Sequence, residues 1–314
     1  MLHKFYYNQR ALETLAAFTT GGRFPHAVLL EGPAGSGRRT FAARMAAALV
    51  CRGEHPPCGE CSQCRKVFSG QHPDVELYGG DGARRSFHID TIRSIRQGAY
   101  ILPGEAPCRV YILAGAENMT VQAQNSLLKI LEEPPEHSVF LLTAENRSML
   151  LPTILSRLQV IKLDPLSPEE IAAALAELSP DTPGEQARWA AENSETIGQA
   201  LTLLTDSGQA RVIGIAGRVL DQMAHGSEYS LLAELEQLGR KREDLLELCE
   251  VLRRGLTRRL LNAATGGEEP LSPRQLTLAL EALDDLQPRV EQNGNVLLLT
   301  TLLGSRLKSA MSGR

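Results

Sequence analysis

His26-Ala-Val-Leu-Leu-Glu31 is followed at once by Gly32-Pro-Ala-Gly-Ser-Gly-Arg-Arg-Thr40. The apolar run predicts a buried strand, and the glycines behind it predict a tight turn that leads into a helix from Thr40 to Val50. A strand, a glycine-rich turn and a helix in this order are the setting of a nucleotide phosphate-binding loop. The segment therefore predicts an α/β domain with a loop of this type.

The loop departs from the pattern that nucleotide hydrolysis needs, which is Gly, four residues, Gly, Lys and then Ser or Thr. Gly32 and Gly37 match the pattern. Arg38 stands at the lysine position, and Arg39 stands where the Mg²⁺-binding hydroxyl belongs. A guanidinium is bulkier than the compact ammonium that contacts the β- and γ-phosphates. We therefore expect no ATP hydrolysis by this chain.

The glycine backbone keeps the capacity to hold an anion at the N-terminus of the helix. Gly32, Gly35, Gly37 and Arg38 are thus candidate residues of a vestigial phosphate site, and a tight turn without a ligand is the alternative. A working site also needs carboxylates at the end of a neighbouring strand. The apolar run at 109–113 continues into Ala-Gly-Ala-Glu, with no acid in its first two positions. A second part of a hydrolytic site is therefore missing.

Three further apolar runs predict strands, with helical patterns between them: Arg109–Leu113, Val139–Thr143 and Val160–Leu163. Strands that alternate with helices predict a parallel sheet with helices on both faces. No strand pattern follows Leu163.

Signals for helix starts and breaks divide the rest of the chain. Ser167, with Glu170 three residues later, is a capping box, and Asp206-Ser-Gly208 suggests a second boundary. Long amphipathic helices follow, with a break at Gly266-Gly267 and a restart at Ser272-Pro273. We predict an α/β domain, a small helical domain and an all-helical C-terminal domain over residues 1–164, 165–207 and 208–314.

Length and composition are those of a globular protein of two or three domains. The chain has 314 residues, 43% of them hydrophobic, and a net charge of −4. This composition excludes a disordered chain and a uniformly basic nucleic-acid-binding surface. The longest apolar run, Met45 to Cys51, is far below the roughly 18 residues that span a membrane. The first residues contain no apolar segment of a secretory signal, so a cytoplasmic location is expected.

Four cysteines lie close together in the sequence: Cys51, Cys58, Cys61 and Cys64. In a reducing compartment such a cluster indicates a metal site rather than disulfides. Zinc favours four thiolates, and a closed four-ligand site is structural; an iron–sulfur cluster also uses four cysteines. His55, inside the loop, is a spare ligand. The isolated Cys108 and Cys249 are expected in the core.

Two segments resemble those of clamp-loader subunits of bacterial DNA polymerase III, which are AAA+ proteins. They are Asn125-Ser-Leu-Leu-Lys-Ile-Leu-Glu-Glu-Pro-Pro135 and Pro152-Thr-Ile-Leu-Ser-Arg157, the latter followed by Leu158 where the family has Cys. The cysteines after the first helix also match. The resemblance implies an AAA+ P-loop-type sheet domain with an inserted zinc knuckle at 51–64, a small helical lid domain and an all-α C-terminal collar domain.

Within this family the chain is similar to the delta prime class. It keeps Ser156-Arg157 and the cysteines, and Gly198 stands where active members present a sensor arginine. The resemblance implies a non-catalytic subunit that assembles with gamma/tau and delta subunits and helps to load the sliding clamp onto primed DNA. Structural zinc would be its own cofactor, and ATP would be bound only by neighbours. Arg157, with Ser156 beside it, would act in trans on a gamma/tau ATP site.

Two alternatives remain open at this stage. One is an ATP-hydrolysing gamma/tau-type clamp-loader subunit, and the residues that argue against it are Arg38, Arg39, Ala114, Gly115 and Gly198. The other is a free-standing AAA+ DNA-binding protein unrelated to replication, against which the Leu-Leu-Lys-Ile-Leu-Glu-Glu-Pro-Pro segment and the cysteines argue.

Overall fold

The computed structural model describes residues 5–79, 87, 89–292 and 295–312, which form two compact units, Met1–Leu201 and Thr202–Arg314. Each unit is described by itself. The predicted three-domain division stays a prediction.

A five-stranded sheet organises the first unit. Its strands are β1 (Ala27–Glu31), β2 (Val75–Tyr78), β3 (Arg109–Ala114), β4 (Ser138–Ala144) and β5 (Gln159–Lys162). They lie in the order β2-β3-β4-β1-β5, and every pair is parallel. Val28 of β1, for example, is aligned with Leu141 of β4. The prediction of a parallel sheet is confirmed.

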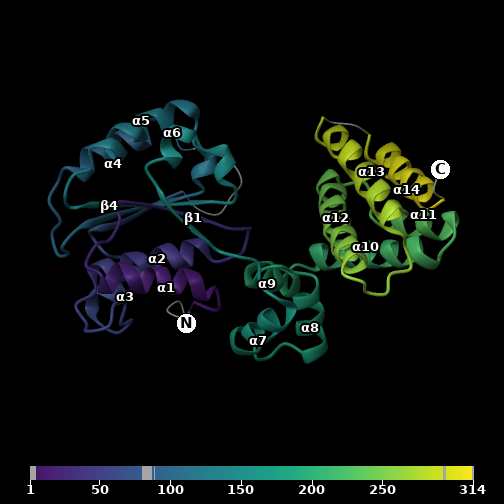
Figure 1. Ribbon diagram of the computed structural model, residues 1–314, viewed down its shortest axis with the longest axis horizontal. Helices are drawn as coiled ribbons and strands as arrows, with labels where there is room; N and C mark the ends of the chain where they lie inside the picture. Colours follow the sequence, from purple (N-terminus) through teal and green to yellow (C-terminus); the bar gives the residue numbers. More distant parts are fainter. Residues whose placement is uncertain (1–4, 80–86, 88, 293–294, 313–314) are drawn as a thin grey trace. The chain divides into compact units, whose positions relative to one another are not determined.

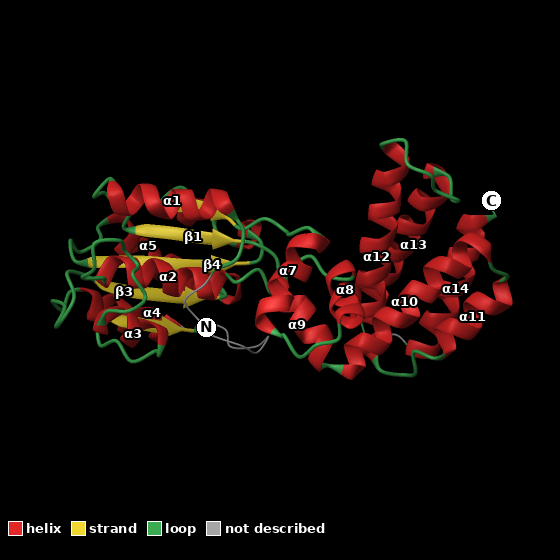
Figure 2. Cartoon of the chain, turned by 90° about the horizontal axis from the view of Figure 1, so that it is seen from below, coloured by secondary structure: helices red, strands yellow, loops and turns green. Residues whose placement is uncertain are grey.

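Helices cover both faces of this sheet (Figure 1 and Figure 2). One face carries α1 (Gln9–Thr20), α2 (Arg38–Val50) and α3 (Ser62–Phe68), and the other carries α4 (Ile89–Ala99), α5 (Val121–Glu132) and the short α6 (Pro152–Leu155). Successive residues of β1 show why both faces are apolar. Val28 and Leu30 pack with Phe41 on the first face, whereas Leu29 packs with Leu127 on the second.

Strand β2 was not predicted from the sequence. Its residues read Val-Glu-Leu-Tyr, it lies at the edge of the sheet, and its side chains are only half-buried or exposed. A strand buried on neither face needs no apolar run, so the strongest sequence signal for a parallel strand is missing here.

Two turns of 3₁₀ helix, η1 (Ala116–Asn118) and η2 (Arg147–Met149), follow β3 and β4. Three short helices come after the sheet: α7 (Pro168–Leu178), α8 (Gly184–Glu192) and α9 (Ile197–Thr205). The predicted capping box of Ser167 and Glu170 is present at the start of α7. Helix α9 begins in the first unit and ends in the second.

The second unit is helical throughout its described part. It contains α10 (Ser207–His225), α11 (Glu228–Glu236), α12 (Arg242–Ala264), α13 (Pro273–Glu291) and α14 (Val296–Met311). Helix α12 ends at Ala264, Gly266 has a φ of 84°, and Ser272 caps α13, so the predicted break and restart are confirmed. In the described ranges, no helix has both the length and the apolar character that crossing a membrane requires.

Candidate functional site

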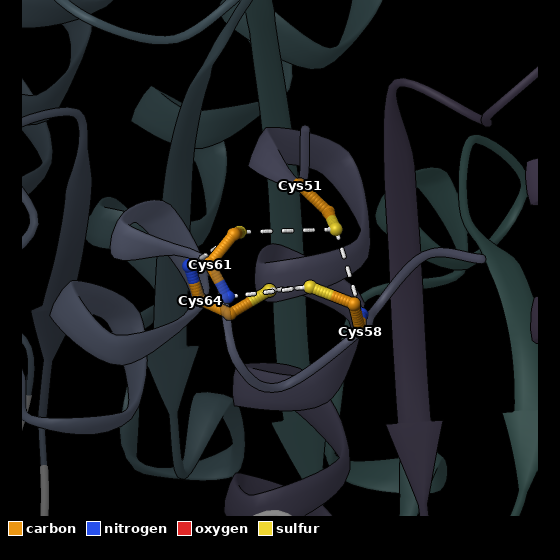
Figure 3. Close-up of side chains that lie close together, drawn as sticks. All are labelled: Cys51, Cys58, Cys61 and Cys64. Atoms are coloured by element: carbon orange, nitrogen blue, oxygen red, sulfur yellow. Dashed lines mark hydrogen bonds between the residues drawn. The ribbon is translucent and has the colours of Figure 1, made fainter. Parts of the chain in front are cut away.

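The four clustered cysteines converge on one point in space (Figure 3). Their Sγ atoms all lie within 4.8 Å of one another, and the Cys51–Cys61 and Cys58–Cys64 pairs are each 4.0 Å apart. Tetrahedral zinc with Zn–S bonds of about 2.3 Å places its sulfur atoms roughly 3.8 Å apart. The donor set and its spacing therefore fit a four-coordinate metal ion.

The ends of two helices position these thiols. Cys51 directly follows α2, and Cys61 caps the N-terminus of α3, where its Sγ accepts a hydrogen bond from the Cys64 N–H at 3.4 Å. Backbone N–H groups of Gly53 and Cys58 point at the Cys51 sulfur at 3.3 and 3.4 Å. Such N–H donors favour a thiolate, which is the form that binds a metal.

The thiols differ in acidity because their surroundings differ. Burial acts to raise the pKa of Cys61, but hydrogen bonds from backbone N–H groups outweigh it and hold the pKa at about 6. Backbone hydrogen bonds likewise lower the pKa of Cys58, whereas burial raises that of Cys64. Burial also raises the pKa of Cys108 and Cys249 to about 11. Cys249 lies in the core as predicted, whereas Cys108 is only partly buried at the edge of the core. The cluster thus begins from a mixture of thiol and thiolate that a cation would shift to thiolate.

The glycine loop lies where the sequence predicted it, between β1 and α2. Gly35 and Gly37 have φ values of 77° and 83°, and Gly37 caps α2. These left-handed conformations are accessible to glycine at little cost, which explains the glycines at both positions.

Residues from elsewhere in the first unit pack against the loop. The Gly198 N–H donates to the Gly35 carbonyl at 3.0 Å, and the buried Thr196 hydroxyl donates to the Ala34 carbonyl at 2.9 Å. A Cβ on Gly35 would lie 2.6 Å from Thr196 Oγ1, and a Cβ on Gly37 would lie 3.0 Å from the Phe5 ring. The neighbouring residues therefore leave little room for a side chain at either positive-φ glycine.

Arg38 is engaged in an ion pair with the acid that follows β4. Its Nη2 lies 3.0 Å from Glu145 Oε1, and its Nη1 is buried without a hydrogen-bond partner in the described part of the chain. Gly32 packs against the carbonyl of Leu163. The role of Gly32, Gly35, Gly37 and Arg38 as a vestigial phosphate site stays a prediction.

The two positions after the predicted strand at 109–113, where a magnesium ligand would be expected, hold Ala114 and Gly115 and no carboxylate. Ala114 is the last residue of β3, and the Gly115 N–H donates to the Thr143 hydroxyl at 3.0 Å. Glu117, the next acid along the chain, accepts a long hydrogen bond of 3.4 Å from the backbone of Glu145. The polar groups at this end of the sheet therefore contact one another.

Ser156 and Arg157 follow α6. The Arg157 side chain is 33% exposed, and its Nη2 lies 2.7 Å from Glu132 Oε1. Its Nη1 donates to the Thr153 carbonyl at 2.7 Å and to the Ser156 hydroxyl at 3.1 Å. Ser156 thus orients the guanidinium, and Glu132 neutralises it.

Sequence reasoning missed Phe5, Glu132, Glu145 and Thr196, which contact the predicted site residues. Glu132 lies within the Leu-Glu-Glu-Pro-Pro segment that carries the resemblance, so its place in that segment was an available signal. Phe5, Glu145 and Thr196 meet their partners from distant points of the chain, and no local pattern reveals such pairs.

Comparison with known proteins decides the family. Residues 7–167, more than half of the chain, match the family described as DNA polymerase III, delta subunit. The chain belongs to this family. The matched range includes the four cysteines, the glycine loop and Ser156-Arg157.

Curated relatives of this family member confirm the predicted resemblance to delta prime subunits. DNA polymerase III subunit delta' of Bacillus subtilis is 35% identical over 182 residues, which are 58% of this chain and 54% of the relative. Subunit delta' of Pseudomonas aeruginosa is 40% identical over 172 residues, 52% of each protein. Subunit gamma/tau of Mycobacterium tuberculosis is 33% identical over 167 residues, 52% of this chain and 28% of the relative. The chain spans about half the length of the delta' relatives it matches.

A solved structure supports the fold. The crystal structure of a DNA polymerase III gamma subunit-related protein from Thermotoga maritima aligns with a TM-score of 0.52 at 20% identity, covering 96% of this family member and 99% of that chain. The parallel α/β sheet with its accompanying helices therefore has the fold of this gamma subunit-related protein.

Proposed function

We propose that this protein is the delta prime subunit of a DNA polymerase III clamp loader, a subunit that hydrolyses no ATP itself and donates Arg157 to the ATP site of an adjacent gamma/tau subunit. One observation carries the proposal. A partly exposed arginine, held by Ser156, is retained in a chain whose own glycine loop carries Arg38 and Arg39 where hydrolysis needs a lysine and a hydroxyl. An arginine of this kind has its use on a neighbour's nucleotide.

The glycine loop supports the non-catalytic half of the proposal. The Gly198 N–H and the Thr196 hydroxyl bind the carbonyl oxygens of Gly35 and Ala34, so the loop is held by the chain's own residues. Arg38, in place of the lysine, is engaged with Glu145. The positions at the end of β3, Ala114 and Gly115, carry none of the acids that hold Mg²⁺ and orient the attacking water. These features disfavour the gamma/tau-type alternative.

The surroundings of Arg157 support its action in trans. Its ion pair with Glu132 is exposed, and pairs of this kind contribute only about 0–1 kcal/mol. A γ-phosphate can therefore replace Glu132 at small cost. The two Nη atoms of a guanidinium meet phosphate oxygens in a fork that lysine cannot copy. The Ser156 hydroxyl would keep the fork aimed while Glu132 is released.

The four cysteines would hold a structural zinc ion. A bound zinc would supply folding energy to the knuckle at 51–64, and the four thiolates leave no open coordination position for catalysis. Cys61 and Cys58, with their lowered pKa values, would be the first to bind as thiolates.

The remaining assignments follow from the family. Helices α7 to α9 would form the lid domain, and the helices from α10 onward the collar that joins gamma/tau and delta subunits. The complex, rather than this chain alone, would open the sliding clamp and place it on primed DNA in the cytoplasm.

Nucleotide binding and turnover by the purified chain test the non-catalytic assignment. We expect no ATP hydrolysis above background, with or without primed DNA. Turnover that needs Mg²⁺ and disappears in Arg38→Ala would contradict the proposal, provided that the variant keeps the thermal stability of the native chain.

A further inference from the structure

The segment at 100–106, between α4 and β3, combines an exposed apolar end with a polar anchor. Tyr100, Ile101 and Leu102 are 65%, 59% and 69% exposed. Gly104, Glu105 and Ala106 follow, bounded by Pro103 and Pro107. Nothing in the arginine or glycine-loop chemistry uses this segment, so its contacts require a separate explanation.

A buried carboxylate holds the backbone of the segment. Asp74, 2% exposed, accepts hydrogen bonds from the backbone N–H groups of Gly104, Glu105 and Ala106 at 2.8, 2.7 and 2.9 Å. Hydrogen bonds to an ionised carboxylate are about twice as strong as neutral ones. Asp74 therefore fixes the turn from which the exposed residues project.

The position of Asp74 is linked to the cysteine loop through two buried side chains. The backbone N–H of Asp74 donates to His72 Nδ1 at 3.0 Å, which leaves the proton of the neutral ring on Nε2. That Nε2 lies 2.6 Å from Gln63 Oε1 and donates to it. Gln63 is the residue before Cys64, and both it and His72 are less than 5% exposed.

Glu105 makes a second link to the same loop. Its carboxylate pairs with Lys66 Nζ and accepts a hydrogen bond from Gln63 Nε2 at 3.5 Å. Its backbone carbonyl accepts from Arg52 Nη2 at 2.9 Å. Arg52 follows Cys51, and Gln63 and Lys66 flank Cys64. Three residues that lie within two positions of a cysteine of the cluster thus contact Glu105.

We propose that the metal at the four cysteines sets the conformation of residues 100–106, and with it the placement of the exposed Tyr100-Ile101-Leu102. A metal that joins Cys51 to Cys64 fixes the neighbouring Arg52, Gln63 and Lys66, because ligand and contact residues share the same short backbone segments. Residues that contact the ligand-bearing segments often set the properties of a metal site. Here the same contacts would transmit the position of the ligands to residues 104–106. The inference rests on the proposed metal and is independent of the role of Arg157.

Hydrogen exchange of the full-length chain tests this inference. The amides of 104–106 are protected by Asp74, so they report whether the turn is held. We expect their exchange to become about tenfold faster when zinc is removed with a chelator, the change that follows from losing one hydrogen bond to a charged group. Adding zinc back should restore slow exchange, and the amides of β4 should not change.

Substitution of Glu105 tests the contacts without disturbing the metal. Glu105→Ala should speed exchange at 104–106 by a similar factor while the zinc content stays the same. Glu54→Gln is the matched control, because Glu54 is an exposed acid of the 51–64 segment and is not among the residues that hold 104–106, and it should leave exchange unchanged. Unaltered exchange at 104–106 in Glu105→Ala, or in the metal-free chain, would overturn the proposal. Elemental analysis separates that failure from an absence of metal.

Discussion

Among the residues of the glycine loop, Gly35 has the strictest requirements. Its φ of 77° is disfavoured for a residue with a Cβ, and that Cβ would lie 2.6 Å from Thr196 Oγ1 and 2.7 Å from the Gln199 backbone nitrogen. Glycine at this position serves the contact between the loop and α9 as much as it serves the turn.

Gly35→Ala should destabilise the first unit by more than the backbone conformation alone explains. We expect about 1 kcal/mol from the left-handed conformation and about 1–3 kcal/mol more from the overlap. Gly22→Ala is the control, since Gly22 has a φ of 62° with nothing within 4 Å of its Cβ position. Urea titration followed by the fluorescence of Trp189, the single tryptophan, measures both. Equal costs for the two variants would disprove the overlap.

Asp74 predicts a specific loss of stability in acid. Burial acts to raise the pKa of this carboxyl, but three backbone hydrogen bonds outweigh it and lower the pKa below the ordinary 3.8. The stabilisation is therefore complete above pH 3.8 and is lost as the pH falls through the lower folded-state pKa. Asp74→Asn should be less stable than the native chain at pH 6, by about 1.5–3 kcal/mol. Thermal midpoints measured from pH 6 to 2.5 should converge; a constant difference would show that the carboxylate charge is not responsible.

The sequence predicted where the site residues lie, but it did not predict all of their contacts. The positions of Cys51, Cys58, Cys61 and Cys64 followed from the sequence, because local spacing alone brings them together. Thr196 meets the glycine loop 161 residues after Gly35 in the chain, and only the folded first unit reveals that pair. The spacing of metal ligands can thus be predicted from a sequence, whereas the contact of a loop with a distant segment cannot.

At the scale of elements, burial decides which strands a sequence reveals. Strands β1 and β4 are fully buried, and their continuous apolar runs made them recognisable. Strand β2 has no buried residue, so no apolar run marks it in the sequence. Its pairing with β3 in the folded chain identifies it as a strand. The segment at 51–64, which runs from the end of α2 into α3, was recognisable for a different reason, because it contains four cysteines at the spacing of metal ligands.

This segment should bind one zinc ion per chain. The donors are four thiols within 4.8 Å of one another, and Cys61, with its pKa of about 6, already favours the thiolate near neutral pH. Cys61→Ser should abolish or greatly weaken zinc binding and loosen 51–64, while the sheet stays folded. Elemental analysis of gently purified protein measures the metal.

Cys108→Ser provides the matched control for that measurement. Cys108 lies outside the cluster, and burial raises its pKa to about 11, so it should remain a thiol and its removal should leave the zinc content unchanged. Iron in place of zinc, or a full complement of zinc in Cys61→Ser, would contradict the assignment.

At the scale of the whole molecule, the first unit contains every residue for which we propose chemistry. The family match at 7–167 lies within this unit, and the helices from α10 onward lie beyond the matched range. We therefore propose that the first unit binds the metal and supplies Arg157 to a neighbouring ATP site, and that the second unit mediates assembly. A change at Arg157 should consequently alter catalysis in a complex without preventing its assembly.

ATP turnover by a reconstituted complex in which only Arg157 is changed tests the central claim most directly. A positioned arginine contributes roughly 10³ or more to turnover at the site where it acts, but this chain would serve only one of several sites. Arg157→Ala should therefore reduce the clamp- and DNA-stimulated ATPase partly, with the complex intact by gel filtration. Arg188→Ala, an exposed arginine of α8, should have no effect. Native activity in an intact Arg157→Ala complex would contradict the account and make Arg157 an ordinary surface residue paired with Glu132.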